Sequence, residues 1–301
     1  MKSKISPPSL LAAVIAGFIS AHGFVNAATI YVSTQAGSID KVSSGSDINF
    51  AVLPGSSSPQ GEGFDINGNL YVAGNQSGAV YKITSGGAVS TFANLPGSSG
   101  PSGLTLDISG NIYVAGNQSG AIYKITSGGA VSTFATLPGS SGPSGLTLDI
   151  SGNLYAAGNQ SGAIYKITSD GSVSTFATLP DSSGPDGLAY DSNGDIYVAG
   201  NQTNAIYKVT SSGAVSTFAT LPSSTGPVGV AFDAIGNLYV AGNQTDTIYK
   251  ITSIGAVSFF ANVSAPRYIA SPQTAPEPSA LLLLIGGFVV LSNRRQRTSS
   301  S

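Results

Sequence analysis

Apolar runs of four to six residues recur along most of this chain, and each is bounded by Gly, Ser, Pro or Asn. The runs are rich in Ile, Val, Tyr, Phe and Thr, which favour β-strands, and none has the spacing of an amphipathic helix. One representative unit contains four such runs: Gly103–Asp107, Asn111–Gly116, Ala121–Thr126 and Val131–Thr136. The pattern therefore predicts short antiparallel strands joined by tight turns.

The unit repeats with a period of 42 residues. One asparagine occurs at five equivalent positions: Asn75, Asn117, Asn159, Asn201 and Asn243. The strands are apolar on both faces, since Ile112 and Val114 alternate with Tyr113 and Ala115. A sheet of this kind must lie between neighbouring sheets, as the blades of a ring do. The repeat therefore predicts an all-β fold, a β-propeller with one four-stranded antiparallel blade per unit.

The two ends of the repeat region predict how the ring closes. A sixth, shorter copy, Thr29–Lys41, begins at its second strand and lacks an innermost strand. Near the other end, Pro266–Ile269 aligns with Pro143–Leu146, where an innermost strand starts. We therefore expect six blades, with the C-terminal segment completing the first.

The conserved spacing inside the unit is similar to that of a known repeat. The pattern Pro-x-Gly, an aliphatic triplet, Asp, Gly-Asn and an aromatic strand is carried by Pro101, Gly103, Asp107, Gly110, Asn111 and Tyr113. It resembles the NHL repeat, and the resemblance covers Thr29–Ala270. It implies an NHL-repeat-like six-bladed propeller and says little about activity, since one fold hosts many functions.

The N-terminal segment has the features of an export signal. Lys2 and Lys4 precede an apolar stretch, Leu10–Ile19, and small residues end at Ala27. This order is typical of a secretory signal peptide. We expect residues 1–27 to be removed after Ala27, which leaves residues 28–272 as the propeller.

The C-terminal segment, residues 273–301, has a second ordered pattern. A Pro276-Glu277-Pro278 triplet precedes the apolar run Ala280–Leu291, and Arg294, Arg295 and Arg297 follow. The pattern resembles the PEP-CTERM sorting signal. The resemblance implies a short hydrophobic helix over residues 279–292, transient insertion into the inner membrane, and cutting by an exosortase-type processing enzyme. Delivery would then be to the cell surface or outside the cell.

Charge and composition restrict the partners. Without the two terminal segments, the chain carries seven basic and thirteen acidic residues, a net charge of −6, and it contains no His, Cys, Trp or Met. Nucleic acid requires basic surfaces, so we do not expect it as a partner. No cofactor is expected.

Enzymes with related six-bladed propellers suggest two catalytic alternatives. A streptogramin-lyase-like enzyme would require a catalytic histidine, and the only one here, His22, lies in the predicted signal peptide. A gluconolactonase-like enzyme would require a metal held by acidic and amide side chains at the axis, for which Glu62 and Asp186 are the candidates. The repeated aspartates, such as Asp191, fit turns better than calcium loops, because no Glu ends the run.

The residue between Pro and Gly at the start of each innermost strand varies while its surroundings repeat. These positions are Gln60, Ser102, Ser144, Asp186, Val228 and Arg267. Variation on a fixed scaffold is where binding usually resides, so we expect these side chains to ring one mouth of the central channel. Arg267 and Asp186 would face each other in that ring.

The sequence thus favours a non-catalytic, exported surface or matrix protein, a binding or scaffold module associated with exopolysaccharide or matrix proteins in a biofilm. Outer strands such as Val131–Thr136 and Val173–Thr178 carry no charge or proline to guard their edges, which indicates lateral association. The alternative is a metal-dependent lactonase- or esterase-like hydrolase that uses Glu62 and Asp186.

Overall fold

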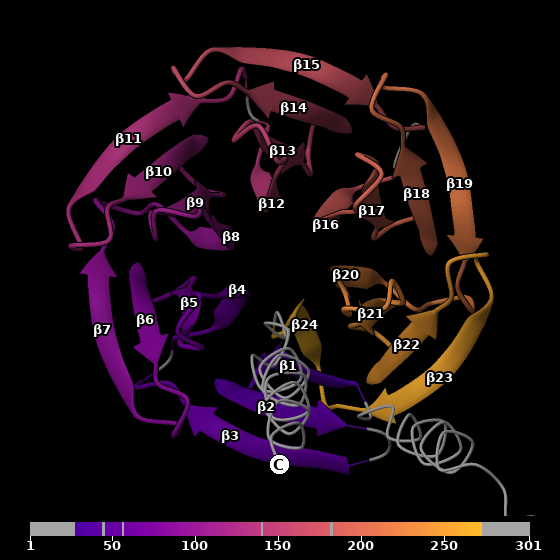
Figure 1. Ribbon diagram of the computed structural model, residues 1–301, viewed down its shortest axis with the longest axis horizontal. Helices are drawn as coiled ribbons and strands as arrows, with labels where there is room; N and C mark the ends of the chain where they lie inside the picture. The colour runs from indigo at the N-terminus through magenta and orange to yellow at the C-terminus, as the bar shows by residue number, and fades with distance from the viewer. Residues whose placement is uncertain (1–27, 44–45, 56, 140, 181–182, 273–301) are drawn as a thin grey trace, which may run out of the picture.

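The computed structural model describes residues 28–272, except 44–45, 56, 140 and 181–182. Six four-stranded antiparallel sheets surround a central axis, as Figure 1 shows. The first blade has the order β24-β1-β2-β3, so the strand nearest the C-terminus completes the sheet that the N-terminus begins. The prediction of a six-bladed propeller closed by a C-terminal strand is confirmed.

Each of the other five blades consists of four consecutive strands, numbered from the axis outward. In chain order, and with the strands of each blade taken from the axis outward, the first three blades are β24 (Pro266–Ala270), β1 (Thr29–Thr34), β2 (Ser38–Ser43) and β3 (Ser46–Val52); β4 (Pro59–Phe64), β5 (Leu70–Gly74), β6 (Ala79–Ile83) and β7 (Val89–Asn94); and β8 (Pro101–Leu106), β9 (Ile112–Gly116), β10 (Ala121–Ile125) and β11 (Val131–Thr136). The last three are β12 (Pro143–Leu148), β13 (Leu154–Gly158), β14 (Ala163–Ile167) and β15 (Val173–Thr178); β16 (Pro185–Tyr190), β17 (Ile196–Gly200), β18 (Ala205–Val209) and β19 (Val215–Thr220); and β20 (Pro227–Phe232), β21 (Leu238–Gly242), β22 (Thr247–Ile251) and β23 (Val257–Asn262).

The core lies between adjacent blades, because the second strand of a blade, counted from the axis, is apolar on both faces in five of the six blades. Strand β9 is buried over its whole length. Tyr113 and Ile122 of the third blade pack in one cluster with Leu146 and Leu154 of the fourth. The Tyr113 ring also meets the Phe134 ring edge-on, with centroids 5.0 Å apart. Each blade therefore buries its apolar side chains only when its neighbour is present, and the closed ring leaves no end blade uncovered.

The turn after each innermost strand is held by its aspartate. The Asp107 Oδ1 atom accepts hydrogen bonds from the Ser109 and Asn111 amides, both 2.9 Å away, and Oδ2 accepts one from Asn111 Nδ2 at 2.8 Å. Gly110 completes the turn with φ +77°, a backbone conformation that other residues adopt only under strain. These carboxylates are turn-forming groups, as the sequence indicated.

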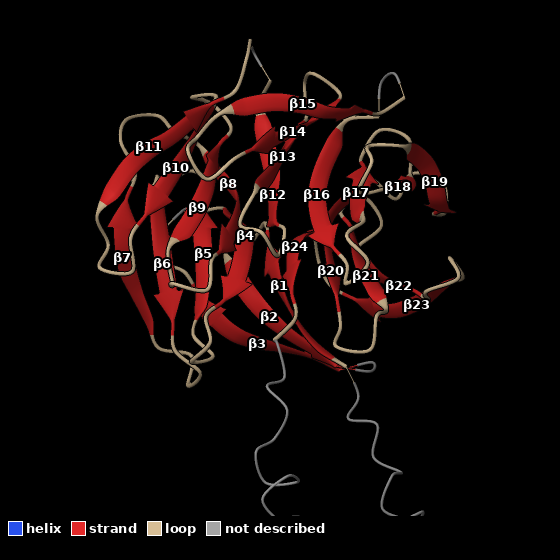
Figure 2. Ribbon diagram, turned by 45° about the horizontal axis from the view of Figure 1, so that its top comes forward, coloured by secondary structure: helices blue, strands red, loops and turns tan. Residues whose placement is uncertain are grey.

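The innermost strands all end at one face of the ring. We call it the turn face; it carries the turns Asp65–Asn69, Asp107–Asn111, Asp149–Asn153, Asp191–Asp195 and Asp233–Asn237. Strand β1 begins and strand β24 ends at this same face, since the two pair antiparallel with Tyr31 opposite Ala270. Figure 2 shows the strands running between the two faces.

The described part of the chain includes no helix with the length and apolar character needed to cross a bilayer. The signal peptide, the sorting segment and the helix predicted over residues 279–292 lie outside the described residues. They stay predictions.

Candidate functional site

Glycines bring the innermost strands close together around the axis. A Cβ on Gly103 would lie 2.3 Å from the Ser144 carbonyl oxygen of the next strand, and one on Gly145 would lie 2.2 Å from the Asp186 carbonyl oxygen. The same contact recurs for Gly61, Gly187 and Gly229. Backbone-to-backbone packing at this distance leaves no space for a side chain, which explains the Gly of each Pro-x-Gly segment.

Strand β24, the innermost strand of the first blade, has no glycine at this position. Alignment of Pro266–Ile269 with Pro143–Leu146 places Tyr268 where the other strands have glycine. Its phenol lies inside the ring and donates a 2.6 Å hydrogen bond to Asp186 Oδ1 on β16. The backbone amide of Tyr268 donates to Ser33 Oγ at 3.0 Å, and Ser33 Oγ in turn donates to the Gln60 carbonyl at 2.8 Å. Tyr268 therefore links three blades across the axis.

A pocket of about 320 Å³ occupies the axis on the turn-face side of Tyr268. Its wall near Tyr268 is a ring with one residue from each innermost strand: Glu62, Leu104, Leu146, Leu188, Val230 and Ile269. Closer to the turn face it is lined by Phe64, Tyr190 and Phe232, and Ser271 lies at its edge. The volume is within the range of small-molecule sites. Most lining side chains are aliphatic or aromatic, while the surface open to a ligand is polar and apolar in about equal parts.

Glu62 is the one ionisable member of that ring. Its Oε1 atom accepts a hydrogen bond from the Ser33 amide at 3.1 Å, while Oε2 is buried without a partner among the described residues. The side chain is only 7% exposed. Burial raises the pKa of this carboxyl well above its usual value; the Ser33 and Ala270 amides offset part of the rise, and the charge of Asp40 adds to it. A carboxyl whose pKa is raised in this way is a stronger base in its ionised form than an exposed glutamate.

Asp186 and Tyr268 form a second polar pair beside the pocket. Burial raises the pKa of Asp186 to about 6, although hydrogen bonds from Tyr268 and Ser144 and the positive charge of Arg267 oppose the rise. Burial, followed by the Asp186 charge and hydrogen bond, raises the pKa of Tyr268 well above its usual value. The phenol therefore keeps its proton and acts as a fixed hydrogen-bond donor.

The six positions predicted to ring a channel mouth lie beside this pair rather than along the pocket wall. Ser102, Ser144 and Val228 are buried, and Gln60, Asp186 and Arg267 keep partial exposure. Ser144 Oγ donates to the Pro185 carbonyl of the next strand at 3.1 Å. Asp186 takes its hydrogen bond from Tyr268, and the one ion pair within the described residues joins Lys208 and Asp195. Ligand binding by the six stays a prediction.

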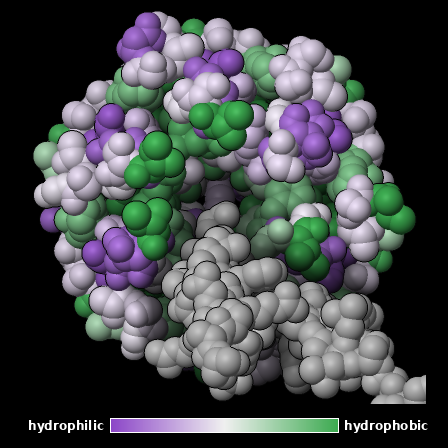
Figure 3. All heavy atoms as spheres, viewed as in Figure 1, coloured by the Kyte–Doolittle hydropathy of each residue, from purple (hydrophilic) through white to green (hydrophobic). Residues whose placement is uncertain are grey.

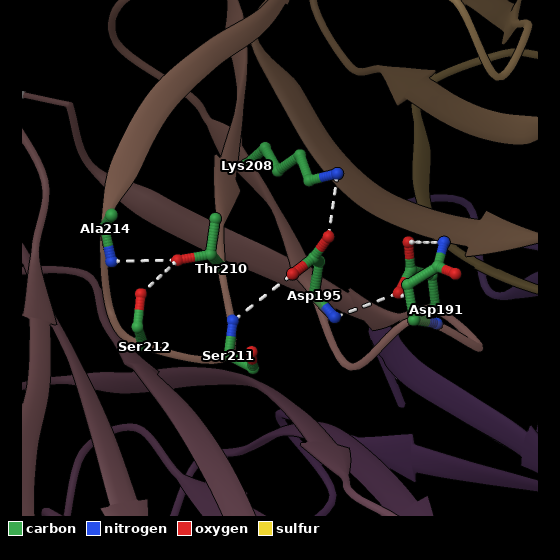
Figure 4. A network of polar contacts seen from close by, with 8 residues as sticks. Asp191, Asp195, Lys208, Thr210, Ser211, Ser212 and Ala214 are labelled. Atoms are coloured by element: carbon green, nitrogen blue, oxygen red, sulfur yellow. Dashed lines mark hydrogen bonds and ion pairs between the residues drawn. The ribbon is translucent and has the colours of Figure 1, made fainter.

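The acidic groups do not fit a metal site. The residues that the structure describes contain no group of three or more His, Cys, Asp or Glu side chains placed to hold an ion. Glu62 faces two amide donors, and Asp186 faces a phenol and a serine. Asp191 accepts the Asn193 and Asp195 amides, both at 2.9 Å, and Asp195 pairs with Lys208 at 2.7 Å (Figure 4). The oxygen atoms of these carboxylates thus accept hydrogen bonds from the protein or pair with a lysine, and they do not converge on a common point where a metal ion could bind.

Sequence reasoning considered Glu62 only as a metal ligand, and it took Tyr268 only as part of the closing strand. The signal for Tyr268 was present, because the alignment that predicts closure also sets a tyrosine against five glycines. Glu62 likewise replaces an aliphatic residue of the repeat. The two departures from the repeat lie on adjacent innermost strands, and both line the pocket.

Fold and site together define a six-bladed propeller with one carboxyl in an axial pocket that is lined mainly by aliphatic and aromatic side chains. A family model described as the virginiamycin B lyase family matches residues 29–271. The chain belongs to the virginiamycin B lyase family. No curated protein sequence matches it.

Solved structures share the fold. The virginiamycin B lyase of Staphylococcus aureus is 24% identical, with a TM-score of 0.62, over 73% of this chain and 76% of that one. A catalytically inactive histidine-to-alanine variant of that lyase, solved with quinupristin, is 25% identical, with a TM-score of 0.62, over 71% and 75%. The calcium-binding protein regucalcin from Agrobacterium tumefaciens is 15% identical, with a TM-score of 0.59, over 74% and 85%.

Family membership corrects the expectation that this protein is not an enzyme. That expectation rested on the lack of a histidine in residues 28–272, which was taken to exclude the lyase-like propellers. The family match covers the whole propeller and includes a lyase among its solved relatives. The chain therefore belongs to a family named for an enzyme, and its axial pocket carries the Glu62 carboxyl.

Proposed function

We propose that this protein is an enzyme that cleaves a carbon–oxygen bond of a small, mostly apolar ester or lactone in its axial pocket. The observation that carries the proposal is the Oε2 atom of Glu62, which is buried in a ring of aliphatic side chains and has no hydrogen-bond partner among the residues that the structure describes. Buried, unpartnered carboxyls are costly, and groups with strongly shifted pKa values concentrate at functional sites.

The side chains that line the pocket restrict the polarity of the substrate. Leu104, Leu146, Leu188, Val230 and Ile269 offer no hydrogen bond from their side chains, so they favour a ligand that buries apolar surface. The Tyr268 phenol keeps its proton, and the described lining residues include no basic side chain that could pair with an anion, which disfavours an anionic substrate.

The reaction is an elimination, in keeping with the lyase family. The Glu62 carboxylate removes a proton from the carbon next to a carbonyl group, and the electron pair forms a double bond to the adjacent carbon. The bond from that carbon to the ester oxygen breaks, and the oxygen leaves as a carboxylate with the electron pair. The raised pKa makes the Glu62 carboxylate a stronger base, and the proton it takes returns to solvent or to the leaving group.

The test is mass spectrometry of a panel of esters and lactones that includes quinupristin, the compound bound by the inactive relative. A ring opened by elimination keeps its mass, so an isomeric product supports the proposal. Addition of one water would replace the lyase with a hydrolase, the second activity that this pocket allows. No turnover and no binding across the panel would contradict an enzymatic role.

Two variants assign the chemistry. Glu62→Gln keeps the size of the side chain and removes the transferable proton, and we expect a loss of 10²-fold or more, roughly the range for general acid–base groups. Asp170→Asn removes an exposed acidic group outside the pocket and is the matched control. We expect it to keep full activity.

Export and sorting belong to the same proposal. The predicted signal peptide and the PEP-CTERM-like tail would place the enzyme at the cell surface or in the surrounding matrix. Mass measurement of the mature protein tests both cuts, since it should begin at Ala28 and end near the Pro276-Glu277-Pro278 triplet.

A further inference from the structure

The turn face carries exposed hydrophobic side chains around the pocket mouth. Ile66, Ile108 and Ile150 follow the aspartates of three consecutive turns and are 91%, 97% and 96% exposed. Ile235 lies one position later in another of these turns and is also exposed. Figure 3 shows strongly hydrophobic residues spaced around the central hollow of the face in view. We call these four side chains the isoleucine crown.

The crown lies outside the hydrophobic core. Each isoleucine lies at the tip of a turn that its aspartate and glycine already hold, and most of its surface faces solvent. Four large aliphatic side chains directed away from one face and surrounding one opening indicate contact with an apolar partner, because scattered single exposures do not gather in this way.

A lysine side chain lies next to two of the crown isoleucines. Lys82 lines a groove of about 430 Å³ together with Ile66 and Ile108. Its ammonium lies 5.5 Å from the centre of the Tyr71 ring, and an equivalent lysine stands over a tyrosine in four other blades. The aspartates of the same turns lie on this face as well, where they accept hydrogen bonds from turn amides. Apolar tips beside ammonium and carboxylate groups suit the boundary between acyl chains and zwitterionic headgroups.

The path of the chain also points to a lipid surface. Strand β24 ends at the turn face, and Ser271 lies at the edge of the pocket. The apolar run Ala280–Leu291, predicted to enter a membrane, begins nine residues later. Nine residues span about 30 Å at most, so a bilayer that holds this run lies within reach of the turn face.

We propose that the turn face docks on a lipid bilayer, with the isoleucine crown inserted among the acyl chains and the pocket mouth opening onto the membrane. The proposal concerns a binding surface and does not depend on the reaction in the pocket. It gives an apolar ligand a route from the bilayer into the site.

The test uses tryptophan, which the natural chain lacks. Ile108→Trp places an indole in the crown of the full-length protein. Val52→Trp places one at an exposed position on β3, at the end of the strand away from the turn face, and serves as the matched control. Each variant is mixed with vesicles of phosphatidylcholine and phosphatidylglycerol, and with the same vesicles carrying brominated acyl chains.

We expect the Ile108→Trp emission to shift to shorter wavelength with vesicles and to be quenched by brominated lipid, while Val52→Trp changes in neither respect. An anchored tail with an undocked propeller would leave both indoles unquenched, which overturns the proposal. A blue shift of Ile108→Trp without vesicles would mean that a second copy or the tail covers the crown, and it would overturn the proposal as well.

Discussion

The Asp186→Asn substitution tests the electrostatics of the axis. Burial raises the pKa of this carboxyl from 3.8 to about 6 in the folded protein. The folded state therefore binds a proton more tightly than the unfolded chain between these values. A raised acidic pKa makes a contribution to stability that is full below the unfolded pKa and is lost as the pH rises through the folded pKa.

The size of the effect follows from the shift. A difference of about 2 pKa units, at about 1.4 kcal/mol per unit, gives about 3 kcal/mol as the upper value, because Asp186 keeps some exposure. The asparagine variant does not titrate and can still accept the Tyr268 hydrogen bond. Relative to the natural protein, its free energy of unfolding should therefore rise by about 2–3 kcal/mol between about pH 3.5 and pH 7.

The assay is urea unfolding followed by circular dichroism at a series of pH values. The difference between the two proteins cancels the contributions of Glu62, Asp40 and Asp47, whose pKa values are also raised in the folded state. Parallel stability profiles for the two proteins would refute the assignment of a raised pKa to Asp186.

Three further substitutions test the packing. Tyr268→Phe removes the 2.6 Å hydrogen bond to Asp186; we expect a loss of about 1–2 kcal/mol in urea unfolding, with the Asp186 pKa rising further in its pH profile. Gly103→Ala places a Cβ 2.3 Å from a backbone oxygen and should lower the free energy of unfolding by about 3 kcal/mol or more. Its control is Gly128→Ala, which should change that free energy by no more than about 0.5 kcal/mol, because the nearest atom to a Cβ on Gly128 is 3.8 Å away. Equal melting temperatures for the two variants would contradict the close approach of the innermost strands. Asp107→Ala removes three turn hydrogen bonds and should cost about 2 kcal/mol, and an unchanged midpoint of denaturation would show that the turn forms without them.

The architecture can be predicted from the sequence because every repeat unit shows the same pattern of apolar strands and polar turns. Strands that are apolar on both faces need neighbours on both sides, and the copy that begins at Thr29 lacks one strand that Pro266–Ala270 can supply. These relations depend on strand order and residue type alone, so they can be read without coordinates.

The site is harder to predict because it depends on side-chain direction. The six residues between Pro and Gly were expected to ring one mouth of the channel because they vary while their surroundings repeat, and ligand binding by them stays a prediction. The pairing register shifts between Pro143 and Leu146, where Ser144 Oγ bonds to the Pro185 carbonyl of the adjacent strand, and it shifts at the same place in other blades. A β-bulge or similar irregularity changes the direction of side chains, and the pattern of apolar and polar residues does not reveal it.

The enzymatic class was missed for a different reason. A histidine was treated as the requirement for lyase chemistry, whereas a carboxyl can transfer a proton when burial raises its pKa. Burial of Glu62 depends on five aliphatic residues from five other blades. That environment appears only when the ring is closed.

The most direct test of the account is the pH dependence of kcat/KM for the best substrate of the ester and lactone panel, measured with the natural protein and with Glu62→Gln. The account predicts that the natural protein gains activity as Glu62 loses its proton, at a pH well above the usual range for a glutamate, and that the variant loses both the activity and this pH step. Equal activity in the two proteins, or an unchanged pH step in the variant, would contradict the assignment of the reaction to Glu62.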